Sequence, residues 1–121
     1  MTTIEQLNIK HPIFLAPMAG VSTPELAAEV SNQGGLGSLG LGAHTVDAAR
    51  EQILRTQELT DFPFQTNFFC HETSPLDEVA AQAWISYFEP IFERYGATAP
   101  SQLNCIYPSF KDHDGYLNLV L

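Results

Sequence analysis

The sequence predicts an α/β protein built on parallel strands. Three short apolar segments begin at residues 13, 36 and 64, which lie 23 and 28 residues apart. This spacing is close to the length of a βα unit, about 30 residues. Helix signals follow the first two segments, so we expect each of these strands to be connected to the next one by a helix.

The first unit begins with the apolar segment 13–16, which lies between two prolines. A continuous apolar run is typical of a strand buried on both faces, as parallel strands are. Ser22 or Thr23 can cap the following helix, and Pro24 is tolerated in its first turn, where no N–H is needed. Gly34, with a second glycine after it, is expected to end the helix. Its predicted apolar face comprises Leu26, Ala27 and Val30.

The second and third units repeat this pattern. The segment 36–39 predicts a strand of small residues, and Thr45 can cap the helix that follows. On this helix we expect Glu51 and Arg55 to form an ion pair, because residues four apart are neighbours on a helix surface. The segment 64–69 predicts a third strand. The predicted apolar face of the second helix comprises Val46, Ala49 and Ile53.

The glycine-rich segment 34–42 contains a Gly-x-Gly spacing. A dinucleotide-binding fingerprint must follow a strand and begin a helix, whereas here the helix comes first. We therefore interpret the segment as a thin strand that lets another backbone or a bulky cofactor approach closely.

After Ser74 the βα pattern ends, and a longer amphipathic helix is predicted. Pro90 lies in its continuation and lacks the N–H that a helix needs, so we expect an end or a kink near Glu89. The aromatic residues of its apolar stripe favour a buried core over a binding site. The stripe comprises Leu76, Val79, Ala80, Ala83, Trp84, Tyr87 and Phe88.

The predicted elements are too few for a closed architecture. A (β/α)8 barrel needs eight strands and about 250 residues, and a three-stranded open sheet leaves two unpaired edges. We expect residues 1–121 to be one partial domain of a protein roughly three times longer. Residues 1–72 would supply three βα-type units, and residues 73–121 a helical insert and the start of a further element.

Composition excludes several classes of protein. The chain has 121 residues, 5 basic and 14 acidic side chains and a formal net charge of −9, so it repels nucleic-acid phosphates. It shows no run of eighteen apolar residues and no signal-peptide pattern, so we expect no membrane span. Cys70 and Cys105 form no CxxC pair, and the four histidines have no metal-ligand spacing. We expect reduced thiols, a cytoplasmic location and no metal.

The loop 16–20, Ala-Pro-Met-Ala-Gly, follows the first predicted strand. In α/β barrels the active site lies at the carboxyl ends of the strands. Small residues here would let a flat ligand approach the backbone. The alternative is a plain βα turn that needs glycine and proline for its geometry.

Asn67 interrupts an aromatic strand end on the same predicted rim. A buried amide without a hydrogen bond costs about 1–3 kcal/mol, so Asn67 needs a partner. That partner is either the backbone of a neighbouring strand or the phosphate or ribityl hydroxyl of a cofactor. His71 is the one histidine expected on this rim.

Several segments together resemble the start of the nitronate monooxygenases, formerly called 2-nitropropane dioxygenases. They are His-Pro-Ile-Phe-Leu-Ala-Pro-Met-Ala-Gly at 11–20, the helix beginning Pro-Glu-Leu-Ala at 24–27, Gly-Gly-Leu-Gly-Ser at 34–38, Thr-Asn-Phe-Phe at 66–69 and Pro-Ser-Phe at 108–110. The segments Ala-Pro-Met and Gly-Gly-Leu-Gly are also shared with other flavin barrels, including flavin-dependent enoyl reductases.

The resemblance implies the N-terminal portion of a TIM barrel that binds FMN and oxidises alkyl nitronates with O₂ to a carbonyl compound and nitrite. The backbone at Ala16, Pro17 and Met18 would pack against the isoalloxazine, and Asn67 matches the family's FMN-contacting asparagine. The family's histidine near the flavin lies on the fourth strand, which would come after Leu121. The alternatives are a truncated, catalytically silent product, or part of another FMN-dependent barrel such as an enoyl reductase.

Overall fold

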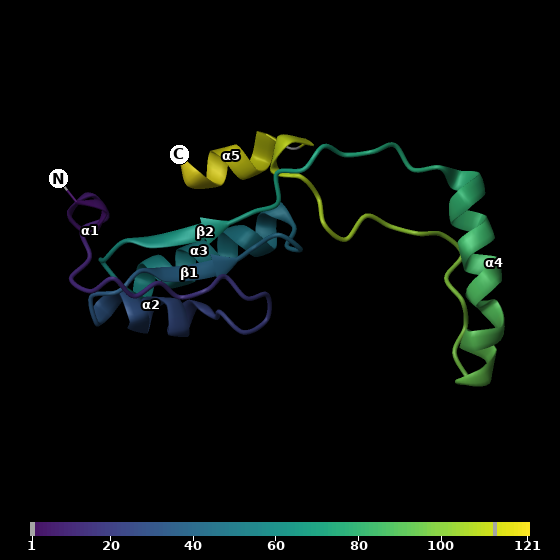
Figure 1. Cartoon of the computed structure of the whole chain (residues 1–121), viewed down its shortest axis with the longest axis horizontal. Helices are drawn as coiled ribbons and strands as arrows, with labels where there is room; N and C mark the ends of the chain where they lie inside the picture. The colour runs from purple at the N-terminus through teal and green to yellow at the C-terminus, as the bar shows by residue number, and fades with distance from the viewer. Residues whose placement is uncertain (1, 113) are drawn as a thin grey trace. The chain divides into compact units, whose positions relative to one another are not determined.

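We analysed a computed structural model, which describes residues 2–112 and 114–121. The fold is α/β with an unclosed parallel sheet (Figure 1). The chain divides into two compact units, one formed by residues up to Glu72 together with Tyr107–Leu121, the other by Thr73–Ile106. In chain order the elements are α1 (Thr3–Gln6), α2 (Pro24–Asn32), β1 (Gly37–Gly40), α3 (Val46–Leu59), β2 (Phe64–Asn67), α4 (Glu78–Arg94), the 3₁₀ helix η1 (Phe110–Asp112) and α5 (Asp114–Val120).

The sheet of the first unit pairs β1 with β2 in parallel, in a register from Gly37 opposite Phe64 to Gly40 opposite Asn67. The first predicted strand is reduced to a single parallel bridge between Phe14 and Leu36. Successive backbone N–H groups of a strand point to alternate edges. The Leu36 N–H bonds to Ile13 and the Leu41 N–H, five residues later, bonds to Asn67, so β1 lies between the bridged segment and β2.

The prediction that residues 13–16 form a strand buried on both faces is wrong. The side chains of Ile13 and Phe14 are 61% and 50% exposed. The physical reason is that this segment lies at the edge of the sheet, where its contact with β1 is limited to two hydrogen bonds of 2.9 Å with Leu36. The third strand is also shorter than predicted and ends at Asn67.

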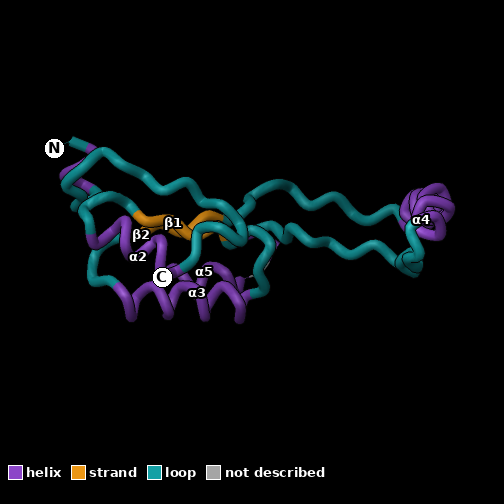
Figure 2. The backbone as a smooth tube through the Cα atoms, turned by 90° about the horizontal axis from the view of Figure 1, so that it is seen from below, coloured by secondary structure: helices purple, strands orange, loops and turns teal. Residues whose placement is uncertain are grey.

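The two faces of the sheet have different surroundings. Figure 2 shows α2, α3 and α5 on the same side of the strands. The core on that side comprises Ala27, Leu39, Leu41, Ala49 and Ile53. Side chains alternate along a strand, so Ser38, Gln65 and Asn67 point to the other face. The Gln65 Nε2 donates to the Ser38 Oγ at 3.2 Å on that face.

Gly37 allows α2 to pack directly on β1. A Cβ atom at this position would lie 2.1 Å from the carbonyl oxygen of Ala27. Ser31 of α2 reinforces this contact, since its Oγ accepts from the Gly37 N–H at 3.0 Å and donates to the Pro63 carbonyl at 2.9 Å. The prediction that the glycine-rich strand admits a close backbone is therefore confirmed.

The predicted caps of α2 and α3 are confirmed. The Thr23 Oγ1 accepts from the Leu26 N–H at 3.2 Å, and the Thr45 Oγ1 accepts from the Ala48 N–H at 3.3 Å. Gly34, with a φ of 89°, follows the end of α2 in the left-handed conformation that favours glycine. The apolar face of α2 differs from the prediction, because Leu26 is exposed whereas Ala27 and Ala28 are buried.

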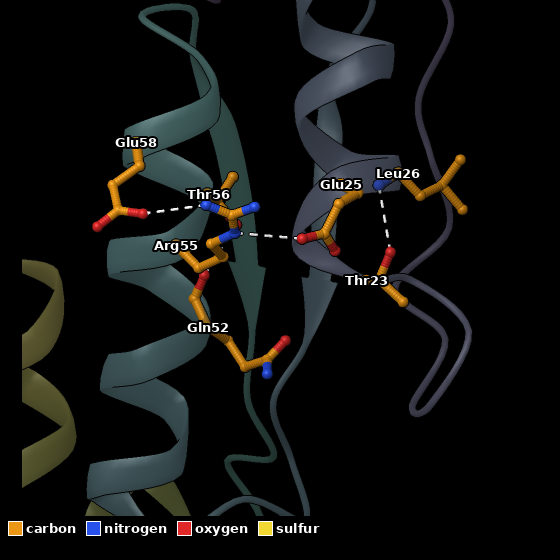
Figure 3. A network of polar contacts seen from close by, with 7 residues as sticks. All are labelled: Thr23, Glu25, Leu26, Gln52, Arg55, Thr56 and Glu58. Carbon is orange, nitrogen blue, oxygen red and sulfur yellow. Dashed lines mark hydrogen bonds and ion pairs between the residues drawn. The ribbon is translucent and has the colours of Figure 1, made fainter.

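Arg55 connects α3 to α2 rather than to its own helix neighbour Glu51 (Figure 3). Its guanidinium bonds to Glu25 on α2 and to Glu58 on α3, each at 3.2 Å. A backbone hydrogen bond and the bond from Arg55 hold the pKa of Glu25 below its ordinary value. The predicted pair fails because α2 packs beside α3 and presents Glu25 within reach. All three side chains are at least half exposed, so these contacts contribute little to stability.

The second unit consists of α4 and the segment that returns along it. Asp77 caps α4, and its carboxylate accepts from the Ala80 N–H at 3.0 Å. The helix continues through Pro90 to Arg94, so the prediction that it ends near Glu89 is wrong. The return segment covers Ala81, and the Gln82 Nε2 donates to the Ser101 carbonyl at 3.0 Å.

The prediction that the apolar stripe of α4 forms a core is also wrong within this unit. Trp84 and Tyr87 are 58% and 70% exposed. The return segment packs beside the stripe, on the side of Ala81, and leaves the stripe itself uncovered. Among residues 2–112 and 114–121, no helix combines the length and apolar character needed to cross a membrane.

The contact at Gly37 predicts a large loss of stability on adding one methyl group. Gly37→Ala forces a Cβ against the α2 backbone and should lower the free energy of unfolding by about 3 kcal/mol. Gly20→Ala is the control, because its Cβ would meet nothing within 4 Å and only its φ of 75° is unfavourable. The control should lose about 1 kcal/mol. Urea unfolding followed by circular dichroism measures both, and equal losses would contradict the packing described here.

Candidate functional site

Three loops meet at the carboxyl end of the parallel sheet. A Cβ added to Gly40 would lie 3.0 Å from the Ala19 nitrogen, so the loop after the bridged segment rests on β1. A Cβ added to Gly42 would lie 2.6 Å from the ring of Phe69, so the loop after β2 rests on the loop after β1. At both glycines, the space that a Cβ would take is already occupied by atoms of the neighbouring loop, so the loops pack directly on one another.

Ser22 holds the first of these loops in place. Its Oγ donates to the Ala16 carbonyl at 2.8 Å and accepts from the Met18 N–H at 2.8 Å. Its own N–H donates to the Met18 carbonyl at 2.8 Å. Ser22 is 7% exposed, so the loop is anchored by a buried hydroxyl. The sequence predicts Ser22 or Thr23 as the cap of α2; the cap is Thr23, and no sequence signal indicates the anchoring role of Ser22.

The anchoring determines what the loop offers to a ligand. The single N–H of Met18 is already bonded to Ser22, and Pro17 has no N–H. Ala16, Pro17 and Met18 are nonetheless all exposed. At Pro17 and Met18 the loop therefore presents a small apolar surface and no free amide donor.

Asn67 is the last residue of β2 and lies on the face opposite the helices. Its carbonyl accepts from the Leu41 N–H at 2.9 Å. Its side-chain amide is exposed and makes no hydrogen bond within the part of the chain that the structure describes. The amide thus keeps both a donor and an acceptor for a further group.

Aromatic side chains border the rim beyond Asn67. Phe69, His71 and Tyr107 line a shallow hollow of about 360 Å³. The rings of Phe69 and Tyr107 are 5.4 Å apart, edge to face. Ser109 brings residue 107 to this place, since its buried Oγ donates to the His71 carbonyl at 2.7 Å. The sequence predicts His71 on this rim, but no local signal in it indicates that Tyr107 returns to β2.

His44, in the loop after β1, is bonded to α5, and His113 lies outside the described residues. The His44 carbonyl accepts from the Tyr116 hydroxyl at 2.7 Å, and its buried Nδ1 has no partner among the described residues. Within residues 2–112 and 114–121, no three His, Cys, Asp or Glu side chains gather as a metal site would require.

A larger hollow, of about 640 Å³, lies at the other end of the sheet. It is lined by the end of α3, the start of β2 and the end of α5, including Ile53, Phe64 and Leu119. In parallel α/β sheets, ligands bind at the carboxyl ends of the strands. We therefore assign the candidate site to the rim that carries Asn67.

The comparisons with known proteins decide the family. The family profile described as nitronate monooxygenase matches residues 1–104. The chain belongs to the nitronate monooxygenase family. It is 56% identical over 104 residues to the nitronate monooxygenase of Paraburkholderia phytofirmans and 44% identical over 115 residues to that of Pseudomonas aeruginosa. Nitronate monooxygenases are oxidoreductases, so the chain comes from an enzyme family.

These matches cover most of this chain and a minor part of each relative. The alignments span 86% and 95% of the chain, but 28% and 33% of the two relatives. Two solved structures are also similar. A nitroalkane oxidase from Streptomyces ansochromogenes aligns with a TM-score of 0.65 and 34% identity, over 79% of this chain and 27% of its own. FabK from Thermotoga maritima aligns with a TM-score of 0.53 and 34% identity, over 77% and 27%.

Membership of this family implies a flavin, and the rim residues fit part of one. The exposed surface at 16–18 suits the flat face of a ring system, and the unpartnered Asn67 amide can bond a polar group beside it. Among the described residues, the basic side chain next to this rim is Lys111, and it is paired with Glu72 rather than free to hold a phosphate. The described residues therefore fit a ring and its polar edge, and leave the phosphate to other parts of a complete site.

The two hydrogen bonds of Ser22 predict that Ser22→Ala destabilises the fold. Each bond contributes about 1 kcal/mol, so the free energy of unfolding should fall by about 1–3 kcal/mol. Ser74→Ala is the matched control, because Ser74 is exposed and should be neutral. Urea unfolding measures both variants. A Ser22→Ala protein as stable as the parent would show that the loop is held by other contacts.

Proposed function

We propose that this chain supplies the first part of a TIM barrel that binds FMN and oxidises alkyl nitronates with O₂, giving a carbonyl compound and nitrite. Residues 1–72 are the first three βα-type units, and residues 73–121 hold a helical insert and the start of a further element. The observation that carries the proposal is the exposed side-chain amide of Asn67, which has no hydrogen-bond partner among the described residues. It lies on the sheet face away from the helices, where its neighbour Gly40 contacts the loop 16–20.

The placement of α2, α3 and α5 on one face of the sheet supports a barrel rather than an open sheet. In a barrel the helices surround the strands, and the inner face is filled by side chains of other strands. Here α2, α3 and α5 cover one face, and polar side chains occupy the other (Figure 2). Ser38 on this face is already buried, whereas Gln65 is half-buried and Asn67 exposed, so strands from the rest of a longer protein would cover these two side chains.

The proposed site residues have distinct roles. The surface of Ala16, Pro17 and Met18 would pack against the isoalloxazine. Ser22 fixes the position of this surface through its hydrogen bonds to Ala16 and Met18. Asn67 would donate to or accept from a polar group of FMN. Bound FMN supplies reversible electron transfer between an organic substrate and O₂. The proposed catalytic histidine belongs to the fourth strand, after Leu121, so this chain contributes binding and orientation.

The proposed partners are small molecules, a nitronate and O₂, in a reducing cytoplasm. Cys70 and Cys105 are free and exposed. Exposed thiols remain reduced most readily in the cytoplasm, where glutathione and thioredoxin act.

A chimera tests the role of Asn67. Residues 1–104 of this chain would replace the matching part of the Paraburkholderia relative, and the chimera should bind FMN and release nitrite from propyl nitronate. Asn67→Leu removes the hydrogen bonds at nearly constant volume. FMN binding should weaken by about 1–3 kcal/mol, roughly 5- to 150-fold in Kd.

The matched control for Asn67→Leu is Gln57→Leu, which removes an exposed amide from α3 on the helix side of the sheet. It should leave the Kd of FMN unchanged. Equilibrium dialysis of the three chimeras gives the comparison. Equal Kd values for all three would make Asn67 a structural residue, and a folded chimera without FMN would contradict the proposed site.

The chain alone should show no nitronate oxidation. It holds only one side of the proposed site, and mis-positioning by about 1 Å already costs around 10²-fold in rate. The assay supplies excess FMN and propyl nitronate and follows nitrite, with free FMN as the background. Turnover clearly above that background would mean that the rest of the family's length is dispensable for the reaction.

A further inference from the structure

The exposed face of α4 carries a cluster of three aromatic rings. Trp84 and Phe88 stack with centroids 5.6 Å apart, and Tyr87 meets both edge to face, at 5.9 Å and 5.1 Å. No other part of the second unit covers them, because the return segment packs on the side of Ala81. Burying such rings against a partner is strongly favourable, since aromatic side chains dominate interface energetics.

Small residues lie beside the rings and leave a hollow. Ala80 and Ala83, together with the three aromatic side chains, line a space of about 620 Å³. The face therefore has both protruding rings and a recess of the kind that rings fill. A surface with both features can be complementary to a second copy of itself, as two-fold interfaces require.

We propose that this face binds the same face of a second copy of the chain, with the two α4 helices antiparallel. A two-fold axis midway between Trp84 and Tyr87 places these two residues opposite each other. The same axis places Ala83 opposite Phe88 and Ala80 opposite Ile91. Each alanine of one copy thus receives a large apolar side chain of the other, over a helix of 17 residues.

Charge supports the antiparallel arrangement in the same register. The axis that pairs the rings with the alanines also places Asp77 opposite Arg94, at both ends of the interface. Arg94 is the one basic residue of α4, and its guanidinium makes no ion pair within the residues that the structure describes. A parallel pair would instead bring the two Arg94 side chains together.

The acidic residues of α4 do not oppose this contact. At 100° per residue, Glu78, Glu89 and Glu93 lie about 120°, 140° and 180° around the helix from Trp84. All three carboxylates therefore stay in solvent when the aromatic face is covered. The interface would desolvate apolar side chains at its centre and keep its charges at the rim, as protein–protein interfaces do.

Sedimentation velocity of the full chain over a range of concentrations tests the proposal. The parent should show a monomer–dimer equilibrium, and Trp84→Glu and Tyr87→Glu should each weaken it by roughly tenfold or more. Arg94→Glu should weaken it roughly two- to fivefold. Ser86→Glu is the matched control, because it adds the same charge on the opposite side of α4 and should change nothing.

Cysteine cross-linking tests the register, in a Cys70→Ser and Cys105→Ser background. Chains with Ala83→Cys should cross-link to chains with Phe88→Cys under mild oxidation, and chains with Ser86→Cys should not cross-link. The proposal is overturned if the parent stays monomeric at every concentration, which would follow if another part of the same chain covers α4. It is also overturned if association is unchanged by Trp84→Glu and Tyr87→Glu, or if Ala83→Cys cross-links best to itself.

Discussion

The contact between α2 and β1 is the interaction on which the first unit depends. Gly37 lets the helix backbone approach the strand, and Ser31 bonds to β1 and to the residue before β2. The helix α2 runs antiparallel to the strands, so its packing against β1 also determines where its first residue lies at the carboxyl end of the sheet. Its cap there is Thr23, and Ser22 just before it anchors the loop 16–18. Packing at the amino end of the sheet thus determines the geometry of the candidate site at the carboxyl end.

The chemistry of the two sheet faces explains why a partial chain still carries information about a site. The face toward the helices is apolar, with Leu39 and Leu41 fully or almost fully buried. The other face carries Ser38, Gln65 and Asn67, and the Asn67 amide has no hydrogen-bond partner in the part of the chain that the structure describes. Polar side chains that point to the inside of a barrel need partners of their own. A family of flavin-dependent oxidoreductases supplies a chemical reason for leaving one of them free.

In the second unit, the amphipathic pattern of α4 predicts which face of the helix benefits from burial, but not what covers that face. The stripe predicts that one face of the helix is buried, and all of its predicted residues except Leu76 lie on α4. Its own unit buries the neighbouring side instead, through Ala81. A hydrophobic stripe identifies a face that benefits from burial, but it does not identify what covers that face. On α4, the alternation of rings and alanines and the opposite charges at its ends indicate a second copy.

By itself, the sequence determined what depends on neighbours a few residues away: the α/β class, the caps at Thr23 and Thr45, the glycine that follows α2, and the positions of β1 and β2. The family could also be recognised from short segments, because they combine a strand end with a loop of small residues. Only the tertiary structure decided that Arg55 bonds to Glu25, that Tyr107 returns to the rim and that Phe14 stays exposed. Capping and periodicity act over one or two helical turns, whereas these contacts join residues placed together by packing or leave a strand edge without a neighbour.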